Sequence, residues 1–162
     1  MGKKNSCLED LKKEYKKLQK KHGLPEFSKL NEDFQIEKVA EVETEHLIRE
    51  IRKFMADKFS NYLRFVEVIL NPVNAPMFVF SFIKSISMDE KNKLIKIYKK
   101  LAKTEIRLIE LDTDFSEKGE ADFIKKNYEL WKEIKKDILS VTEAVKRNWD
   151  NKFETNGKGY FG

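Results

Sequence analysis

One short segment of the chain, residues 71–87, has apolar residues on every side and is preceded and followed by charged sequence with helical periodicity. From Met77 to Ile83 every residue except Ser81 is apolar. A helix without a polar face is normally buried all round, and each buried aromatic side chain contributes about 1.5–3 kcal/mol to stability. We therefore expect a short buried helix at the centre of the core, so that Phe80→Ala would cost about 3–5 kcal/mol.

The residues before this segment predict where its helix begins. Pro72 interrupts the preceding helix, because proline lacks an N–H group and disfavours the α conformation of the residue before it. Asn74 is the expected N-cap, and Pro76 lies in the first turn, where a missing donor costs nothing. A buried strand is one alternative, since the run is short and rich in phenylalanine. An exposed segment that docks a partner or a second copy of the chain is another.

The length and composition favour a single helical domain. The chain has 162 residues, enough for one sizeable core, and its three prolines and six glycines leave little material for the turns of an all-β fold. The charged fraction of 38% and the apolar fraction of 40% are typical of amphipathic helices and unlike those of a disordered chain. We expect one helical-bundle domain over residues 1–150 and a flexible tail over residues 151–162.

Apolar residues recur at helical spacing in four further stretches of the chain. The expected helices cover residues 6–22, 44–70, 88–111 and about 116–149. Ser6 and Ser87 each begin a capping box, and Gly23 is the expected C-cap of the first helix. Residues 26–42 are expected to form a loop that packs on the core, with room for one short helical turn and a helical end. Short loops join neighbouring helices head to tail, so the predicted architecture is all-α, an irregular antiparallel bundle of four main helices and the short apolar one.

Few residues could support catalysis or bind a metal. Cys7 is the only cysteine, which excludes an internal disulfide and a cysteine-built metal site. His46 ends a Glu-x-x-His pattern like that of carboxylate-bridged di-iron bundles, but the second copy that such a site needs is missing. Residues 112–114 lack the register of a calcium loop, and the chain has no glycine-rich phosphate loop. We therefore expect no catalytic residue, no cofactor and no metal site.

The sequence also predicts a soluble, cytoplasmic protein without membrane contact. The N-terminal residues offer no apolar core for a secretory signal. The most apolar region, residues 63–83, contains Arg64, Glu67 and two prolines, which a membrane-spanning helix would not tolerate.

The charged residues are interleaved rather than segregated. The net charge is +5, from 33 basic and 28 acidic residues, and such interleaving usually marks a solvated helix surface. Four lysines nevertheless share one side of an expected helix and are the candidate contacts to nucleic acid: Lys96, Lys99, Lys100 and Lys103. They would neutralise phosphates and give salt-sensitive binding without sequence preference, although no recognition module accompanies them.

The apolar stripes are wider than one bundle core requires, and they include many of the twelve phenylalanines. This excess favours a non-enzymatic protein that acts through protein–protein contacts or self-association. The candidate interface residues are Phe78, Phe82, Trp131 and Trp149. Electrostatic nucleic-acid binding through the lysines is the alternative hypothesis, and an enzyme whose site is assembled only in the fold is a third.

The middle of the chain also carries a resemblance. Residues 47–53 (LIREIRK) and the stretch that continues to residues 69–72 (ILNP) resemble small helical proteins of archaea whose function is uncharacterised. The resemblance covers roughly the middle third of the chain and implies an all-helical fold. It carries no catalytic or ligand-binding residue across.

Overall fold

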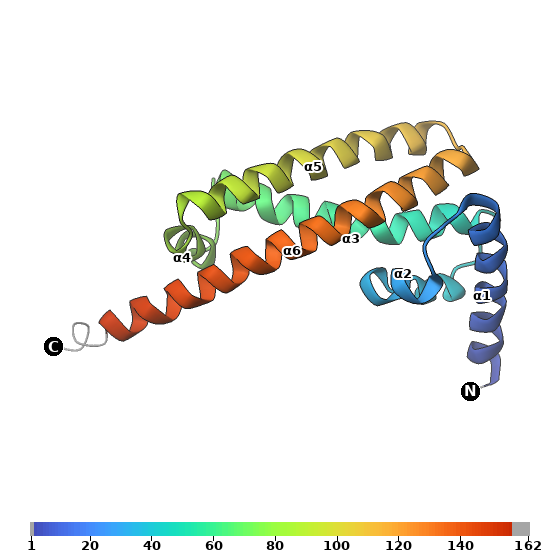
Figure 1. Ribbon diagram of the computed structural model, residues 1–162, viewed down its shortest axis with the longest axis horizontal. Coiled ribbons are helices and arrows are strands. Elements are labelled where there is room, and N and C mark those ends of the chain that lie inside the picture. The colour runs from blue at the N-terminus through green and yellow to red at the C-terminus, as the bar shows by residue number, and fades with distance from the viewer. Residues whose placement is uncertain (1, 157–162) are drawn as a thin grey trace. The chain divides into compact units, whose positions relative to one another are not determined.

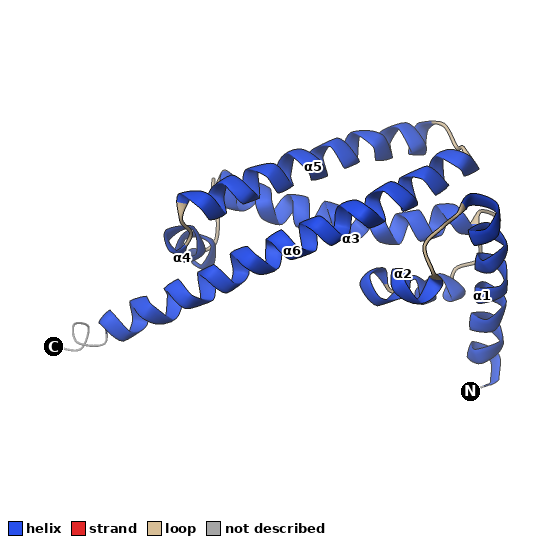
Figure 2. Cartoon of the chain, viewed as in Figure 1, coloured by secondary structure: helices blue, strands red, loops and turns tan. Residues whose placement is uncertain are grey.

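The computed structural model describes the backbone of residues 2–156 and the side chains of residues 7–149. Over this part of the chain the structure consists of helices joined by short loops, without a strand, as Figure 2 shows. The prediction of an all-α fold is confirmed.

The helices follow one another along the chain as drawn in Figure 1. Their bounds are α1 Gly2–His22, α2 Phe27–Phe34, the 3-10 helix η1 Ile36–Glu41, α3 Leu47–Leu70, α4 Met77–Ser85, α5 Met88–Thr113 and α6 Glu117–Asn156.

Parts of the secondary structure differ from those expected, and α3 begins at Leu47 instead of residue 44. Helix α1 begins at Gly2, so Ser6 lies inside the helix instead of capping it. Helix α6 runs to Asn156, past its expected end near residue 149, and the rest of the expected tail lies outside the described residues. The expected loop at residues 26–42 contains α2 and η1, because Gln35 takes a left-handed conformation (φ 54°) and donates its N–H to the Asn31 carbonyl at 2.8 Å. This turn separates two short helices, where the loosened periodicity indicated only one helical turn and a helical end.

Two local signals were predicted correctly. Gly23 has φ 65° and donates its N–H to the Gln19 carbonyl at 2.8 Å, which ends α1. At the start of α5 the Ser87 N–H donates to Glu90 Oε2 at 2.7 Å, and the Glu90 N–H donates to Ser87 Oγ at 3.4 Å. These hydrogen bonds from Ser87 lower the pKa of the Glu90 carboxyl. The end of α1 and the start of α5 are therefore specified by residues close in sequence.

The chain divides into two compact units. Unit 1 comprises Met1–Ser60 and Thr104–Trp131, and unit 2 comprises Asn61–Lys103 and Lys132–Gly162. Helices α3, α5 and α6 contribute residues to both. The single domain over residues 1–150 stays a prediction.

The core of unit 1 is built around Phe59, which is completely buried. Its ring centroid lies 6.0 Å from that of Phe34 and 6.0 Å from that of Trp131, the latter in an edge-to-face arrangement. The Lys58 ammonium lies over the Trp131 ring, 4.5 Å from its centroid. Trp131 is only 2% exposed, so it belongs to this core.

In unit 2, α4 buries one side only. Val79 and Phe82 are 8% and 4% exposed, and the Phe82 ring packs edge-on against Phe65 at 5.8 Å. Phe80 is 41% exposed, so the expectation of a core phenylalanine at this position is wrong. The segment is a helix, as expected, but in the described structure only one of its sides is covered. Its N-cap residue is Pro76 rather than Asn74.

Candidate functional site

Exposed apolar side chains concentrate on and around α4. Eleven large hydrophobic residues of the described chain are exposed, and five of them lie between residues 73 and 88. These five, which we call the α4 surface, are Val73, Met77, Phe78, Phe80 and Met88, with exposed fractions of 73%, 81%, 60%, 41% and 69%. The α4 surface is therefore the strongest departure from an ordinary solvated helix surface.

The helical register of α4 explains why these side chains face solvent. Val79 and Phe82 are three residues apart and point into unit 2, so Met77 and Phe80 fall on the opposite side of the helix. Phe78 lies at the margin, where its ring centroid is 6.1 Å from that of Trp149. The side of α4 that carries Val79 and Phe82 packs into unit 2, and this leaves the opposite side exposed.

Only part of the candidate interface predicted from sequence is available at the surface. Phe78 is exposed and Trp149 is partly exposed beside it. Phe82 and Trp131 are buried in the cores of unit 2 and unit 1, because they lie on the packed sides of α4 and α6. Their burial removes these two residues from the candidate interface.

Hydrogen bonds and a ring contact hold α4 in place. The Asn148 Nδ2 group of α6 donates to the Ser85 carbonyl at 2.6 Å, and Ser85 Oγ donates to the Ser81 carbonyl at 2.9 Å. With the Phe65–Phe82 contact, these bonds fix α4 against the rest of unit 2. The α4 surface is preorganised rather than formed by a free loop.

A pocket of about 390 Å³, which we call the α4 pocket, adjoins this surface. It lies where α3 ends and α5 begins, beside α4. Its lining residues are Ile69, Leu70, Pro72, Ile83, Ile86, Ser87, Met88 and Lys91. Lys91 is exposed, and no carboxylate of the described residues lies within ion-pair distance of it. The pocket therefore combines aliphatic walls with one cation that has no ion-pair partner in the described part of the chain.

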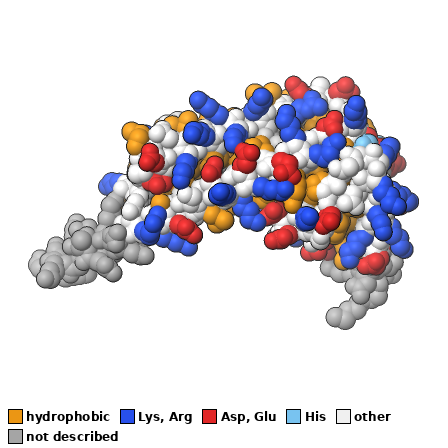
Figure 3. Space-filling model, in the orientation of Figure 1, with side chains coloured by type: hydrophobic (Ala, Val, Ile, Leu, Met, Phe, Trp, Pro, Cys, Tyr) orange, Lys and Arg blue, Asp and Glu red, His pale blue; other side chains and the backbone are white. Residues whose placement is uncertain are grey.

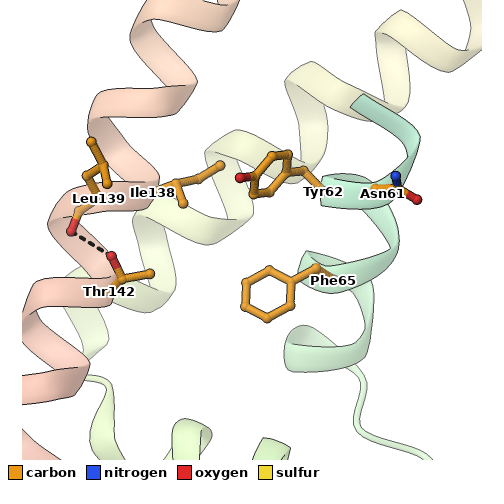
Figure 4. A pocket seen from close by; sticks show the side chains of 6 residues that line it. All are labelled: Asn61, Tyr62, Phe65, Ile138, Leu139 and Thr142. Carbon is orange, nitrogen blue, oxygen red and sulfur yellow. Dashed lines mark hydrogen bonds between the residues drawn. The ribbon is translucent and has the colours of Figure 1, made fainter. Parts of the chain in front are cut away.

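A second groove, of about 350 Å³, lies between α3 and α6 in unit 2. Figure 4 shows Tyr62 and Phe65 of α3 pointing toward Ile138 of α6. The Thr142 hydroxyl donates to the Leu139 carbonyl of its own helix at 2.9 Å. The groove is mostly apolar, and no acid–base pair lines it among the described residues. It therefore offers an apolar binding surface and no catalytic group.

The four candidate lysines differ in their ion pairing. Lys96, Lys99 and Lys103, which we call the lysine ridge, are exposed on α5 and have no carboxylate of the described residues within ion-pair distance. Lys100 pairs with Glu133 at 2.7 Å. On the face shown in Figure 3, basic and acidic side chains are mixed. The lysine ridge is thus a local feature and not one edge of a wholly basic surface.

Unit 1 contains a buried ion pair. Arg52 is 2% exposed and Glu120 is 0% exposed; Arg52 Nε donates to Glu120 Oε2 at 2.8 Å, and its Nη2 donates to Asp112 Oδ1 at 2.6 Å. Burial lowers the pKa of Arg52, but the hydrogen bonds and charges of the two carboxylates outweigh it and raise this pKa. The Arg49 Nη2 atom lies 3.7 Å from Asp112 Oδ1. Because each charge is compensated, the arrangement holds α3, α5 and α6 together and offers no reactive group.

In the sequence, Arg52 stands beside Arg49 and Lys53 and resembles a member of a small basic surface cluster. Arg52 lies four residues after Ile48 and three before Met55, both on the buried stripe of α3. This position was the available signal that its charge would be buried. Its partner Glu120, 68 residues away, lies three residues before Phe123 and four before Ile124, both buried in α6, so its position carried the same signal.

Other polar groups have local structural roles. The His46 ring stacks on Phe115 with centroids 4.4 Å apart, and the Cys7 thiol donates to the Ala40 carbonyl at 2.9 Å. His22 Nε2 lies 2.6 Å from Glu117 Oε1, and hydrogen bonds from Lys21 and His22 lower the pKa of the Glu117 carboxyl. Among the described residues, no three His, Cys, Asp or Glu side chains are grouped as a metal site would require. Nor is any helix of this part of the chain long and apolar enough to cross a membrane.

Comparisons with protein-family models, with curated proteins and with solved structures find no match to this chain. The function is therefore inferred from the geometry of the α4 surface, the α4 pocket and the lysine ridge.

Proposed function

We propose that this chain acts through protein–protein contact at the α4 surface, and that the first protein it binds there is a second copy of itself. The observation that carries the proposal is the concentration of exposed large hydrophobic side chains within residues 73–88. Scattered exposed hydrophobic residues need no explanation, but a cluster that adjoins an apolar pocket is typical of a protein-binding site.

The residue types on the α4 surface suit this role. Phe78 and Phe80 offer large, rigid areas that bind with little loss of side-chain freedom. Met77 and Met88 are flexible and adapt to the shape of a partner. Because α4 is already fixed by Phe82 and Ser85, association would not have to order a backbone segment. The surface combines anchors, adaptable contacts and a preformed backbone.

The double substitution Phe78→Ser and Phe80→Ser should weaken self-association at least about tenfold in Kd. Both side chains are exposed in the chain described here, so the loss falls on the interface and not on the core. A tenfold change corresponds to about 1.4 kcal/mol, and truncating one central anchor commonly costs more than about 1 kcal/mol. Light scattering over a concentration series, at low and high salt, measures the effect.

Leu139→Ser is the matched control, since Leu139 is 54% exposed in unit 2 but lies outside the α4 surface. It should leave the association curve unchanged. A wild-type protein that stays monomeric up to high micromolar concentration would contradict the proposal, as would an equal effect of both substitutions.

Binding of nucleic acid through the lysine ridge is the second candidate function. The observation that favours it is the charge distribution: residues 91–103 contain six lysines and no acidic residue. Unit 2 carries 15 basic against 8 acidic residues, a net charge of +7, whereas unit 1 carries 18 against 20, a net charge of −2. The excess positive charge of the chain thus belongs to the unit that bears the lysine ridge.

The double substitution Lys96→Glu and Lys99→Glu should abolish binding of a labelled single-stranded oligonucleotide at low salt. Lys16→Glu with Lys20→Glu on α1 changes the net charge equally and should bind like the wild type. Fluorescence anisotropy at two salt concentrations measures both, since phosphate contacts lose affinity steeply as salt rises. Equal losses in the two variants would mean that only net charge matters, and absence of binding at low salt would end this candidate.

A further inference from the structure

A second group of exposed apolar side chains lies in unit 1, on the last three turns of α5. Ile106 and Ile109 are 62% and 65% exposed and are three residues apart, so they share one side of the helix. The buried side of the same turns is formed by Leu108 and Leu111, at 5% and 1% exposure. Ile106 and Ile109 therefore contribute nothing to the core of unit 1.

We infer that the α4 surface and the α4 pocket of one copy receive the Ile106–Ile109 face of a second copy. This inference rests on the proposed function and names the surface that α4 binds. The contact joins two different faces of the chain, so it is head-to-tail and not a symmetric pairing of α4 with α4.

Shape and polarity favour this pairing. The α4 pocket has aliphatic walls that include Ile69, Ile83 and Ile86, and its volume of about 390 Å³ gives room for aliphatic side chains. A helix that presents two aliphatic residues at i and i+3 is the usual occupant of such a groove. Ile106 and Ile109 meet this requirement with side chains that are already exposed.

Charge complementarity favours it as well. Residues 104–115 contain four carboxylates and one arginine, whereas the α4 pocket bears Lys91 in a unit of net charge +7. Asp114 is exposed. Within residues 7–149 Glu110 forms an ion pair only with Arg107 of its own helix, and 58% of its side chain stays exposed. An exposed pair of this kind is weak, so Glu110 remains able to face Lys91 of the other copy.

A symmetric contact would bring like charges together. Pairing α4 with α4 brings Lys91 of one copy toward the basic unit 2 of the other, and like charges at an interface disfavour association. The head-to-tail contact instead places the basic unit against the acidic segment of α5.

Head-to-tail contacts can be tested by complementation. The first variant, Phe78→Ser with Phe80→Ser, lacks a working α4 surface but keeps Ile106 and Ile109. The second variant, Ile106→Ser with Ile109→Ser, keeps the α4 surface. All four side chains are exposed, so each variant should fold, and circular dichroism would check this. Each variant alone should be monomeric at concentrations where the wild type associates, whereas an equimolar mixture should form a one-to-one dimer that grows no further in sedimentation velocity.

The outcomes separate this inference from the proposed function. If the second variant alone associates like the wild type, the α4 surface binds some other face and the inference is overturned while the proposed function stands. A mixture that stays monomeric also overturns the inference. If the wild type itself never associates, the proposed function fails, and the head-to-tail contact fails with it.

Discussion

Replacing Glu120 by alanine should destabilise the protein by about 3–5 kcal/mol, the usual cost of removing one partner from a buried ion pair. The Glu120 side chain is completely buried and accepts hydrogen bonds from Arg52 Nε at 2.8 Å and from Arg52 Nη2 at 3.4 Å. Without it, the guanidinium of Arg52 keeps only Asp112, whose side chain is 55% exposed. The main cost is the uncompensated charge that remains buried in unit 1.

Urea denaturation followed by circular dichroism measures this loss. Lys100→Ala, which breaks the exposed pair with Glu133, is the control and should cost less than about 1 kcal/mol. Replacing both buried partners, as in Arg52→Met with Glu120→Leu, should recover much of the stability, because no charge is then left alone. A Glu120→Ala protein as stable as the control would contradict the account of the Arg52–Glu120 pair.

Phe59→Ala should also cost about 3–5 kcal/mol, because it leaves a cavity between Phe34 and Trp131. Phe80→Ala provides the matched comparison: the same substitution at a side chain that is 41% exposed should cost less than about 1 kcal/mol. Urea denaturation of the two variants separates them. Equal losses of unfolding free energy would show that α4 is covered on both sides and that Phe80 belongs to the core.

The contrast between Phe80 and Phe82 shows where sequence-based prediction ends. The two residues are apolar, lie two positions apart and belong to the same helix, yet one is exposed and the other is buried. Sequence patterns predicted the helix and the interruption at Pro72, because those depend on neighbouring residues. They could not predict which side of an all-apolar helix is covered, because that depends on the helices that pack against it.

The candidate site was predicted in part for the same reason. Of the residues predicted to form an interface, Phe78 is exposed, whereas Trp131 lies in the core. Ile106 and Ile109 could have been found: they fall off the stripe that Leu108 and Leu111 continue, so they were predictable as exposed apolar residues.

The most direct test of the α4 surface uses the methionines as probes. The chain has four, of which Met77 and Met88 lie on the α4 surface, Met55 is completely buried in unit 1, and Met1 is outside the described residues. Methyl NMR spectra of protein with labelled methionine would be recorded over a dilution series. We predict that the Met77 and Met88 signals shift and broaden as concentration rises while the Met55 signal stays constant. Signals of Met77 and Met88 that do not change with concentration would contradict the proposal that a second copy binds the α4 surface.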